Sequence, residues 1–169
     1  MRHVSTIVLV HVIISLIAIV AGVIVMFGLL GSRAMPGLTA IFLILTILTN
    51  ATGFVIPPLV TEKLLPSHII GGLSLVLLAI ACIALYAMQL KGAWRPIYIV
   101  TAMVSLYLNV FVLVIQSFLK VPALQALAPA VPPNPPAGPV FAAVQGIVLV
   151  FFAVMIIGAW RRFRPVNFA

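Results

Sequence analysis

The side chains with most capacity for chemistry are two histidines and two asparagines, His11, His68, Asn50 and Asn109, each in or beside an apolar run. An imidazole can ligate haem iron, and both imidazoles and amides can hydrogen-bond a quinone. Because polar groups inside a membrane are costly, their positions mark candidate sites. We therefore consider a ligand pocket in the outer half of the bundle, with candidate lining residues His11, Asn50, His68, Asn109, Gln116 and Gln145.

Two ligand classes suit this predicted pocket. Haem held by two histidines needs His11 and His68 at similar depth on facing helices, one on each side of the iron. His11 lies about seven residues into its run, roughly 10 Å deep, whereas His68 opens its own. Haem therefore needs a tilt that corrects this difference, while a quinone or other lipid-like ligand needs only an apolar pocket with a few polar groups.

A metal site is a third possibility. His3, His11, Glu62 and His68 are ligand types that suit a metal ion, and all four fall toward one predicted face of the membrane. Their spacing includes no close ligand pair such as H-x-x-x-H. We predict no metal site from this pattern.

Catalysis by this chain finds little support in the sequence. Glu62 is the one acidic residue, which excludes a mechanism built on two carboxylates of this chain. Cys82 lies deep in an apolar run, where a thiol is unreactive. The chain has no glycine-rich phosphate loop and no paired-cysteine motif. We assign no catalytic residue and lean away from an enzyme.

Helix packing is the competing interpretation of the same polar residues. At helical spacing, His11, Ser15, Ala18 and Gly22 share one face, and so do Thr101, Ser105, Asn109 and Gln116. Membrane helices associate through small residues and interhelical hydrogen bonds. On this interpretation Ala18-x-x-x-Gly22 is a contact seam, and Asn50 and Asn109 join helices.

Composition identifies the elements that must position these residues. The chain has 169 residues, of which 65% are hydrophobic and 6% charged, and its mean hydropathy is +1.40. A soluble domain is about 45–50% apolar and about 25% charged, so a soluble fold is excluded. One cysteine excludes a disulfide framework. The net charge of +8 is spread over short gaps between apolar runs, which fits topology signals and lipid headgroups; we expect no nucleic-acid partner.

Five apolar runs approach the length that spans a bilayer, about 20 residues. They cover residues 4–30, 38–56, 68–88, 97–119 and 140–160. Backbone groups must be paired in lipid, so we predict an all-α polytopic membrane protein, a single domain made of a five-helix bundle. Residues 121–139 are rich in proline and alanine, and we expect an extended loop outside the membrane without helix.

Charge also predicts orientation. Five spans place Arg33, Lys91, Arg95 and the C-terminal arginines on one side, six cations against three on the other. The positive-inside rule makes that side cytoplasmic and the N-terminus external. Trp94, Tyr98 and Trp160 fall at the same side, where we expect an aromatic belt.

The sequence thus predicts a small bacterial inner-membrane protein. Our first hypothesis is a structural or accessory subunit whose polar seams join helices to each other, to membrane-protein partners or to further copies of the chain. The alternative is a protein that binds haem, a quinone or a lipid in the polar pocket. Either form contacts the lipid bilayer directly.

Overall fold

The computed structural model describes residues 2–55, 66–128 and 136–164, with side chains described from residue 6 and from residue 68 in the first two ranges. Every secondary-structure element in the described part of the chain is a helix, and five of these helices are long and apolar enough to cross a membrane. This confirms the predicted all-α, five-span fold. The protein is a multi-pass membrane protein.

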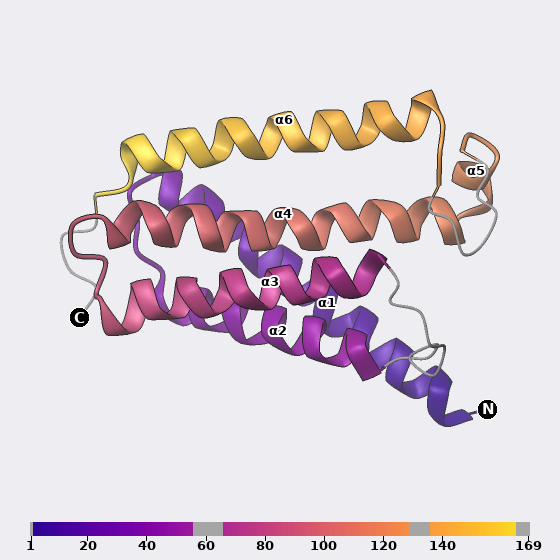
Figure 1. The fold of residues 1–169 in the computed structure, drawn as a ribbon, viewed down its shortest axis with the longest axis horizontal. Helices are drawn as coiled ribbons and strands as arrows, with labels where there is room; N and C mark the ends of the chain where they lie inside the picture. Colours follow the sequence, from indigo (N-terminus) through magenta and orange to yellow (C-terminus); the bar gives the residue numbers. More distant parts are fainter. Residues whose placement is uncertain (1, 56–65, 129–135, 165–169) are drawn as a thin grey trace.

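The long helices alternate in direction along the bundle (Figure 1). In chain order the elements are α1 (Arg2–Leu30), α2 (Pro36–Val55), α3 (Pro66–Cys82), the π-helical turn η1 (Ile83–Ala87), α4 (Trp94–Lys120), α5 (Pro122–Gln125) and α6 (Pro139–Arg162). Each range expected from hydropathy overlaps one long helix, and η1 completes the third span.

The short helix α5 differs from the expected extended loop. Pro122 stands in its first turn, where a fixed φ favours a helix and the missing N–H costs no bond. The expectation that residues 121–139 contain no helix was therefore wrong at 122–125. The proline run at 132–136 lies almost entirely outside the described residues.

The bundle has two ends, which we call the Phe163 end and the His68 end after a residue at each. The Phe163 end holds the α1–α2 turn, the segment 88–93 between η1 and α4, and the residues that follow α6. The His68 end holds the start of α3 and the end of α4. Helix α1 begins toward the His68 end, and α6 finishes at the Phe163 end (Figure 1).

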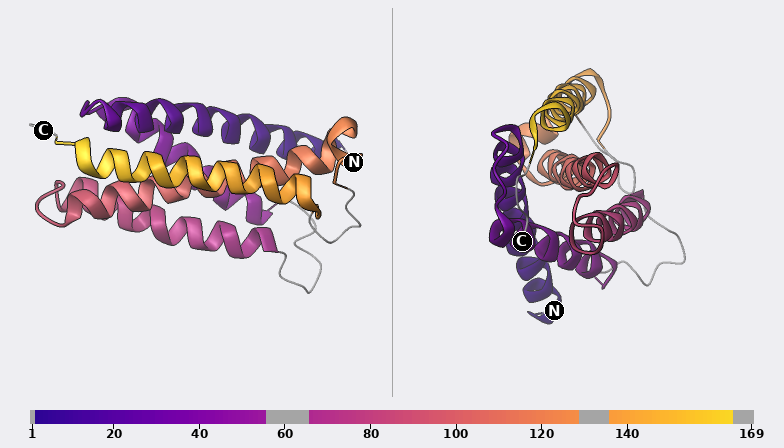
Figure 2. Two further views of the ribbon diagram at one scale, coloured as in Figure 1. Left: turned by 90° about the horizontal axis from the view of Figure 1, so that it is seen from above. Right: turned by 90° about the vertical axis from the view of Figure 1, so that its left-hand side faces the viewer.

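Helix α4 is the centre of the bundle. It packs against α1, α2, α3 and α6, and Figure 2 shows it enclosed by them in the view along the bundle. Its fully buried side chains include Tyr98, Met103 and Leu106. By contrast, α6 packs only on α4 and α1 among the described helices.

A close approach of α1 to α2 and α4 confirms the predicted small-residue seam. Ala18 is fully buried, and a Cβ built on Gly22 would lie 2.6 Å from Leu106 Cδ1 and 2.8 Å from the Phe42 ring. A side chain at position 22 would therefore push the helices apart. This contact is the van der Waals packing that membrane helices use in place of hydrophobic exclusion.

The expected aromatic belt is only partly present. Trp160 is 52% exposed and Trp94 is half-buried, both near the Phe163 end. Tyr98 is fully buried, so its assignment to the belt was wrong. Its position on the inner face of the central helix turns the ring toward α2, where its hydroxyl faces Thr39 outside hydrogen-bonding geometry.

Candidate functional site

The predicted lining residues lie on several helices and make separate contacts. His11 belongs to α1, Asn50 to α2, His68 to α3, Asn109 and Gln116 to α4, and Gln145 to α6. Most of them lie toward the His68 end because each is close to the helix terminus found there. The contacts decide which of them the fold brings together.

His11 is hydrogen-bonded across the α1–α2 interface. Its Nδ1 lies 2.9 Å from the Thr52 hydroxyl, which itself lies 2.7 Å from the Leu48 carbonyl oxygen. A hydroxyl has one hydrogen, and here the helix carbonyl takes it. Thr52 therefore accepts from His11 Nδ1–H, which places the proton of the neutral imidazole on Nδ1. The Nε2 lone pair has no partner among the described residues.

Asn50 connects α2 to α3. Its Nδ2 donates to the Thr46 carbonyl oxygen at 2.8 Å and to the Ser74 hydroxyl at 3.1 Å. Ser74 is fully buried, so this amide–hydroxyl contact lies inside the bundle. Asn50 thus acts as the interhelical link that the packing interpretation predicts.

His68 packs on α2 through a ring contact. Its imidazole stacks on Phe54, with ring centroids 5.6 Å apart and planes 18° apart, and the residue is 9% exposed. His11 contacts α2 at Thr52, two residues before Phe54 and so about 200° away around the helix. The two imidazoles therefore meet different sides of α2.

The two histidines are not brought together. Over their described residues α1 and α3 do not pack on each other, and α2 stands between them. A haem held by both imidazoles needs facing helices, and this arrangement does not supply them. The geometry favours separate environments for His11 and His68.

Asn109 and Gln145 are buried amides with one unpartnered atom each. Gln145 Nε2 donates to the Phe111 carbonyl oxygen at 3.1 Å and so joins α6 to α4, while its Oε1 has no partner among the described residues. Asn109 is 8% exposed, and its Nδ2 is likewise unpartnered there. Gln116 is half-buried on α4.

The metal candidates are only partly described. Glu62 and the side chain of His3 lie outside the described residues. Within the described part of the chain, no three His, Cys, Asp or Glu side chains come together. His11 and His68 are held by the different contacts described above.

Hydroxyl side chains mostly bond within their own helices. Ser15, Thr46, Thr101, Ser105 and Ser117 each donate to the carbonyl oxygen four residues earlier. Such bonds satisfy a hydroxyl in lipid without a partner helix. The polar stripes therefore contain both self-satisfied hydroxyls and true interhelical links.

Sequence reasoning missed the partners of the predicted residues, namely Thr52, Phe54, Ser74 and Phe111. Thr52 and Ser74 carry hydroxyls, a signal that was visible in the sequence, but their partners depend on how each helix is rotated. Phe111 contributes only a backbone carbonyl, which no sequence pattern announces.

No family model, curated protein or solved structure matches the chain. The class of protein therefore follows from the fold and its polar contacts. It is a small multi-pass membrane protein whose helices are joined by buried polar side chains.

Proposed function

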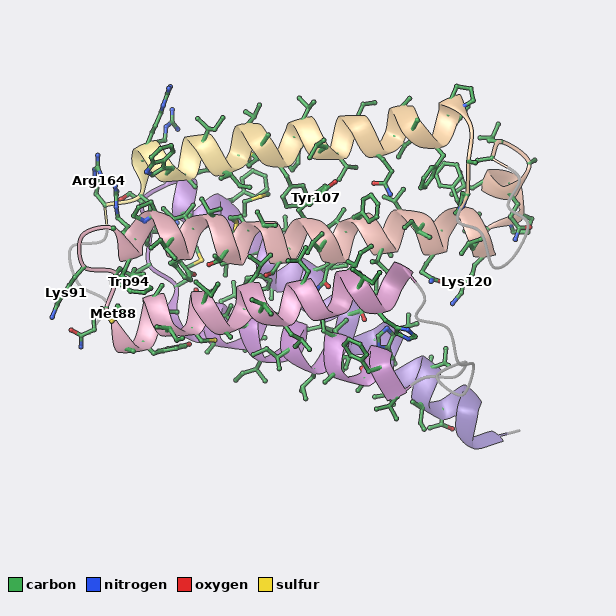
Figure 3. The ribbon with its side chains drawn as sticks, in the orientation of Figure 1. Met88, Lys91, Trp94, Tyr107, Lys120 and Arg164 are labelled. Atoms are coloured by element: carbon green, nitrogen blue, oxygen red, sulfur yellow. The ribbon has the colours of Figure 1, made fainter. Side chains whose placement is uncertain are left out.

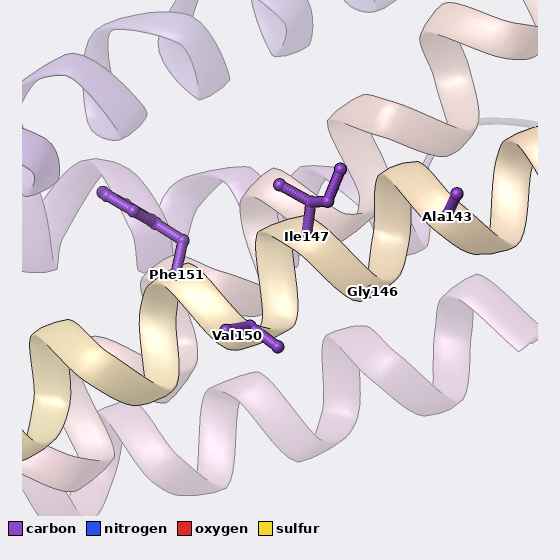
Figure 4. Close-up of a pocket in the computed structure, with 5 residues that line it drawn as sticks. All are labelled: Ala143, Gly146, Ile147, Val150 and Phe151. Carbon is purple, nitrogen blue, oxygen red and sulfur yellow. The ribbon is translucent and has the colours of Figure 1, made fainter.

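We propose that this protein is a structural or accessory subunit of a complex in the bacterial inner membrane, and that α6 is its contact helix. In an apolar 18-residue stretch of α6, 11% of the residues are buried within the chain, against 39% in the equivalent stretch of α4. The face of α6 away from the bundle carries a shallow apolar depression lined by Ala143, Gly146, Ile147, Val150 and Phe151 (Figure 4). The occupant we propose is a transmembrane helix of another subunit.

Gly146 is the observation that carries this proposal. A Cβ built there meets nothing within 4 Å, unlike Gly158 on the same helix, where it would lie 2.8 Å from Leu30. Gly158 is therefore explained by packing against α1. A mid-helix glycine costs about 1 kcal/mol relative to alanine, and no contact in the described part of the chain requires it at position 146. Close approach of an outside helix gives it a role.

The experiment is a pull-down from mild detergent with Gly146→Leu, which fills the depression. The matched control is Ala79→Leu, a small exposed residue on α3. We expect Gly146→Leu to lose the co-purified membrane subunit and Ala79→Leu to retain it. Wild-type protein that purifies as a monomer with no partner contradicts the proposal. If wild type purifies as a homodimer that Gly146→Leu breaks, the partner is a second copy of this chain and not another subunit.

A second candidate function is ligand binding at His11. The observation that favours it is the hydrogen bond from His11 Nδ1 to Thr52, because Nε2, which has no partner among the described residues, is then preorganised to accept a hydrogen bond or to bind haem iron. One such imidazole suits a hydroxyl donor, on a lipid or on the reduced quinol form of a quinone, or a haem whose other ligand comes from outside the chain. Asn50 faces Ser74 on α3, away from the Thr52 side of α2, so among the predicted lining residues this candidate rests on His11.

Spectroscopy and lipid extraction test this second candidate. A Soret band that His11→Ala abolishes and Ala79→Leu preserves would support haem. Mass spectrometry of extracted lipids would reveal a retained quinone, which the same His11→Ala variant should lose. A colourless preparation without quinone or specific lipid removes the candidate.

The proposed orientation has the N-terminus outside and the C-terminus in the cytoplasm. Its support is the six cations at the Phe163 end, since positive residues favour the cytoplasmic side. In a Cys82→Ser background, a membrane-impermeant thiol reagent applied to intact cells should label Gln125→Cys and spare Arg161→Cys. The reverse pattern inverts the assignment.

A further inference from the structure

The peptide group between Phe163 and Arg164 is held on both sides. Its carbonyl oxygen accepts from the Arg95 guanidinium, and its N–H donates to the Ser32 hydroxyl at 2.8 Å. Phe163 itself is fully buried. The residues after α6 are thus fixed against the α1–α2 turn and the first turn of α4.

This attachment brings Arg95 close to Arg164. The Arg95 guanidinium bonds the peptide group from which the Arg164 side chain departs, so the two positive charges repel each other. Arg95 uses one of its five N–H donors in the bond to Phe163, and Arg164 is exposed. Like charges held together are unfavourable unless an anion lies between or beside them.

The chain supplies no such anion in its described part. Glu62, the only acidic side chain in the sequence, lies outside the described residues. Figure 3 shows Arg164, Lys91 and Trp94 at the Phe163 end, with Lys120 at the other. The cations gathered at the Phe163 end are Arg33, Lys91, Arg95, Arg161, Arg162 and Arg164.

We propose that Arg95 and Arg164 form a binding site for the phosphate of an anionic phospholipid headgroup. Guanidinium groups present paired N–H donors that match two phosphate oxygens, and a second arginine adds a second pair. Arg95 is fixed by Phe163, so one side of the site is already ordered before the lipid arrives.

The surroundings favour a lipid over a soluble phosphate. The site stands where α4 begins and α6 has just ended, at the level where a spanning helix meets headgroups. Trp160, one turn before Arg164, is 52% exposed, as is usual for an aromatic at the membrane interface. Val154 and Ile157, 62% and 48% exposed, continue an apolar surface for the acyl chains.

The test compares two variants that each remove one exposed cation from the Phe163 end, Arg164→Gln and Arg161→Gln. Full-length protein is titrated with phosphatidylglycerol in detergent and read by native mass spectrometry. We expect wild type to bind the lipid, and Arg164→Gln to bind about tenfold more weakly because it loses a bidentate contact. Arg161→Gln should change affinity about threefold or less, because an exposed charge outside the site is screened.

The second variant is Arg95→Lys, which keeps the positive charge and an N–H donor for the Phe163 carbonyl oxygen. We expect it to weaken phosphatidylglycerol binding as well, because an ammonium cannot form the paired contact. Equal losses in Arg161→Gln and Arg164→Gln would overturn a defined site in favour of diffuse surface charge. Equal binding of phosphatidylcholine, or full displacement of phosphatidylglycerol by inorganic phosphate, would overturn an anionic lipid as the ligand.

Discussion

Arg95 donates to the carbonyl oxygen of Phe163, a residue 68 positions further along the chain. The bond joins the first turn of α4 to the residue that follows α6. The next N–H, that of Arg164, donates to the hydroxyl of Ser32 in the α1–α2 turn. Phe163 is fully buried beneath these contacts. The buried Phe163 side chain and the peptide group between Phe163 and Arg164 therefore tie together three chain segments at this end of the bundle.

Replacement of Phe163 by alanine should destabilise the protein strongly. Truncation of a buried phenylalanine costs about 3–5 kcal/mol through lost contacts and the cavity left behind. Arg162→Ala, at the exposed neighbouring position, should change stability by about 0.5 kcal/mol or less. Thermal unfolding in detergent measures both; equal melting temperatures would mean that Phe163 does not close the bundle.

Two glycines should respond oppositely to alanine. At Gly22 a Cβ would lie within 2.8 Å of Leu106 and Phe42, and overpacking of this kind costs about 1–3 kcal/mol. At Gly146 the same methyl group meets open space, so better helix propensity should make the change neutral or stabilising by up to about 1 kcal/mol. Unfolding of the isolated chain compares them. A destabilising Gly146→Ala would show that our account of that position is incomplete.

The Asn50–Ser74 contact should contribute a measurable coupling energy. Polar contacts between membrane helices average about 0.6 kcal/mol and reach about 1.7 kcal/mol. A double-mutant cycle with Asn50→Ala and Ser74→Ala isolates the contact. The bond from Asn50 to the Thr46 carbonyl is lost in both the single Asn50→Ala variant and the double variant, so its contribution cancels. Additive effects of the two changes would exclude a stabilising hydrogen bond.

Asn109 should behave differently from Asn50. Its Nδ2 is buried and has no partner among the described residues, so Asn109→Leu removes an unsatisfied donor whose burial costs about 1–3 kcal/mol. We expect the Asn109→Leu variant to be as stable as wild type or more so. Asn50→Leu, which breaks two hydrogen bonds of 2.8 and 3.1 Å, should lose stability. A large loss in Asn109→Leu would indicate that its amide serves the native state through an unseen partner.

Sequence patterns predicted what depends on one helix at a time. Length and hydropathy located the five spans, and the spacing of Ala18 and Gly22 located a packing seam. The relation between His11 and His68 was beyond such patterns, because it depends on which helices are neighbours and α2 stands between them. Tyr98 was misplaced for a similar reason: its depth suited a membrane interface, but its rotation on the central helix buried it. The role of Phe163 needed the tertiary fold, since a lone aromatic after a helix resembles an interface anchor.

The proton on His11 gives the sharpest test of the candidate site. Because Thr52 donates to the Leu48 carbonyl oxygen, His11 must donate from Nδ1, and nitrogen NMR of labelled histidine should show the Nδ1–H form when the imidazole is neutral. Thr52→Val removes the acceptor while keeping the shape, so the Nε2–H form should then gain population. Ser15→Ala is the control, because that hydroxyl bonds only the His11 backbone carbonyl, at 2.6 Å. If wild type already shows Nε2–H, the nitrogen left to meet a ligand is Nδ1, which faces Thr52, and the proposed use of His11 fails.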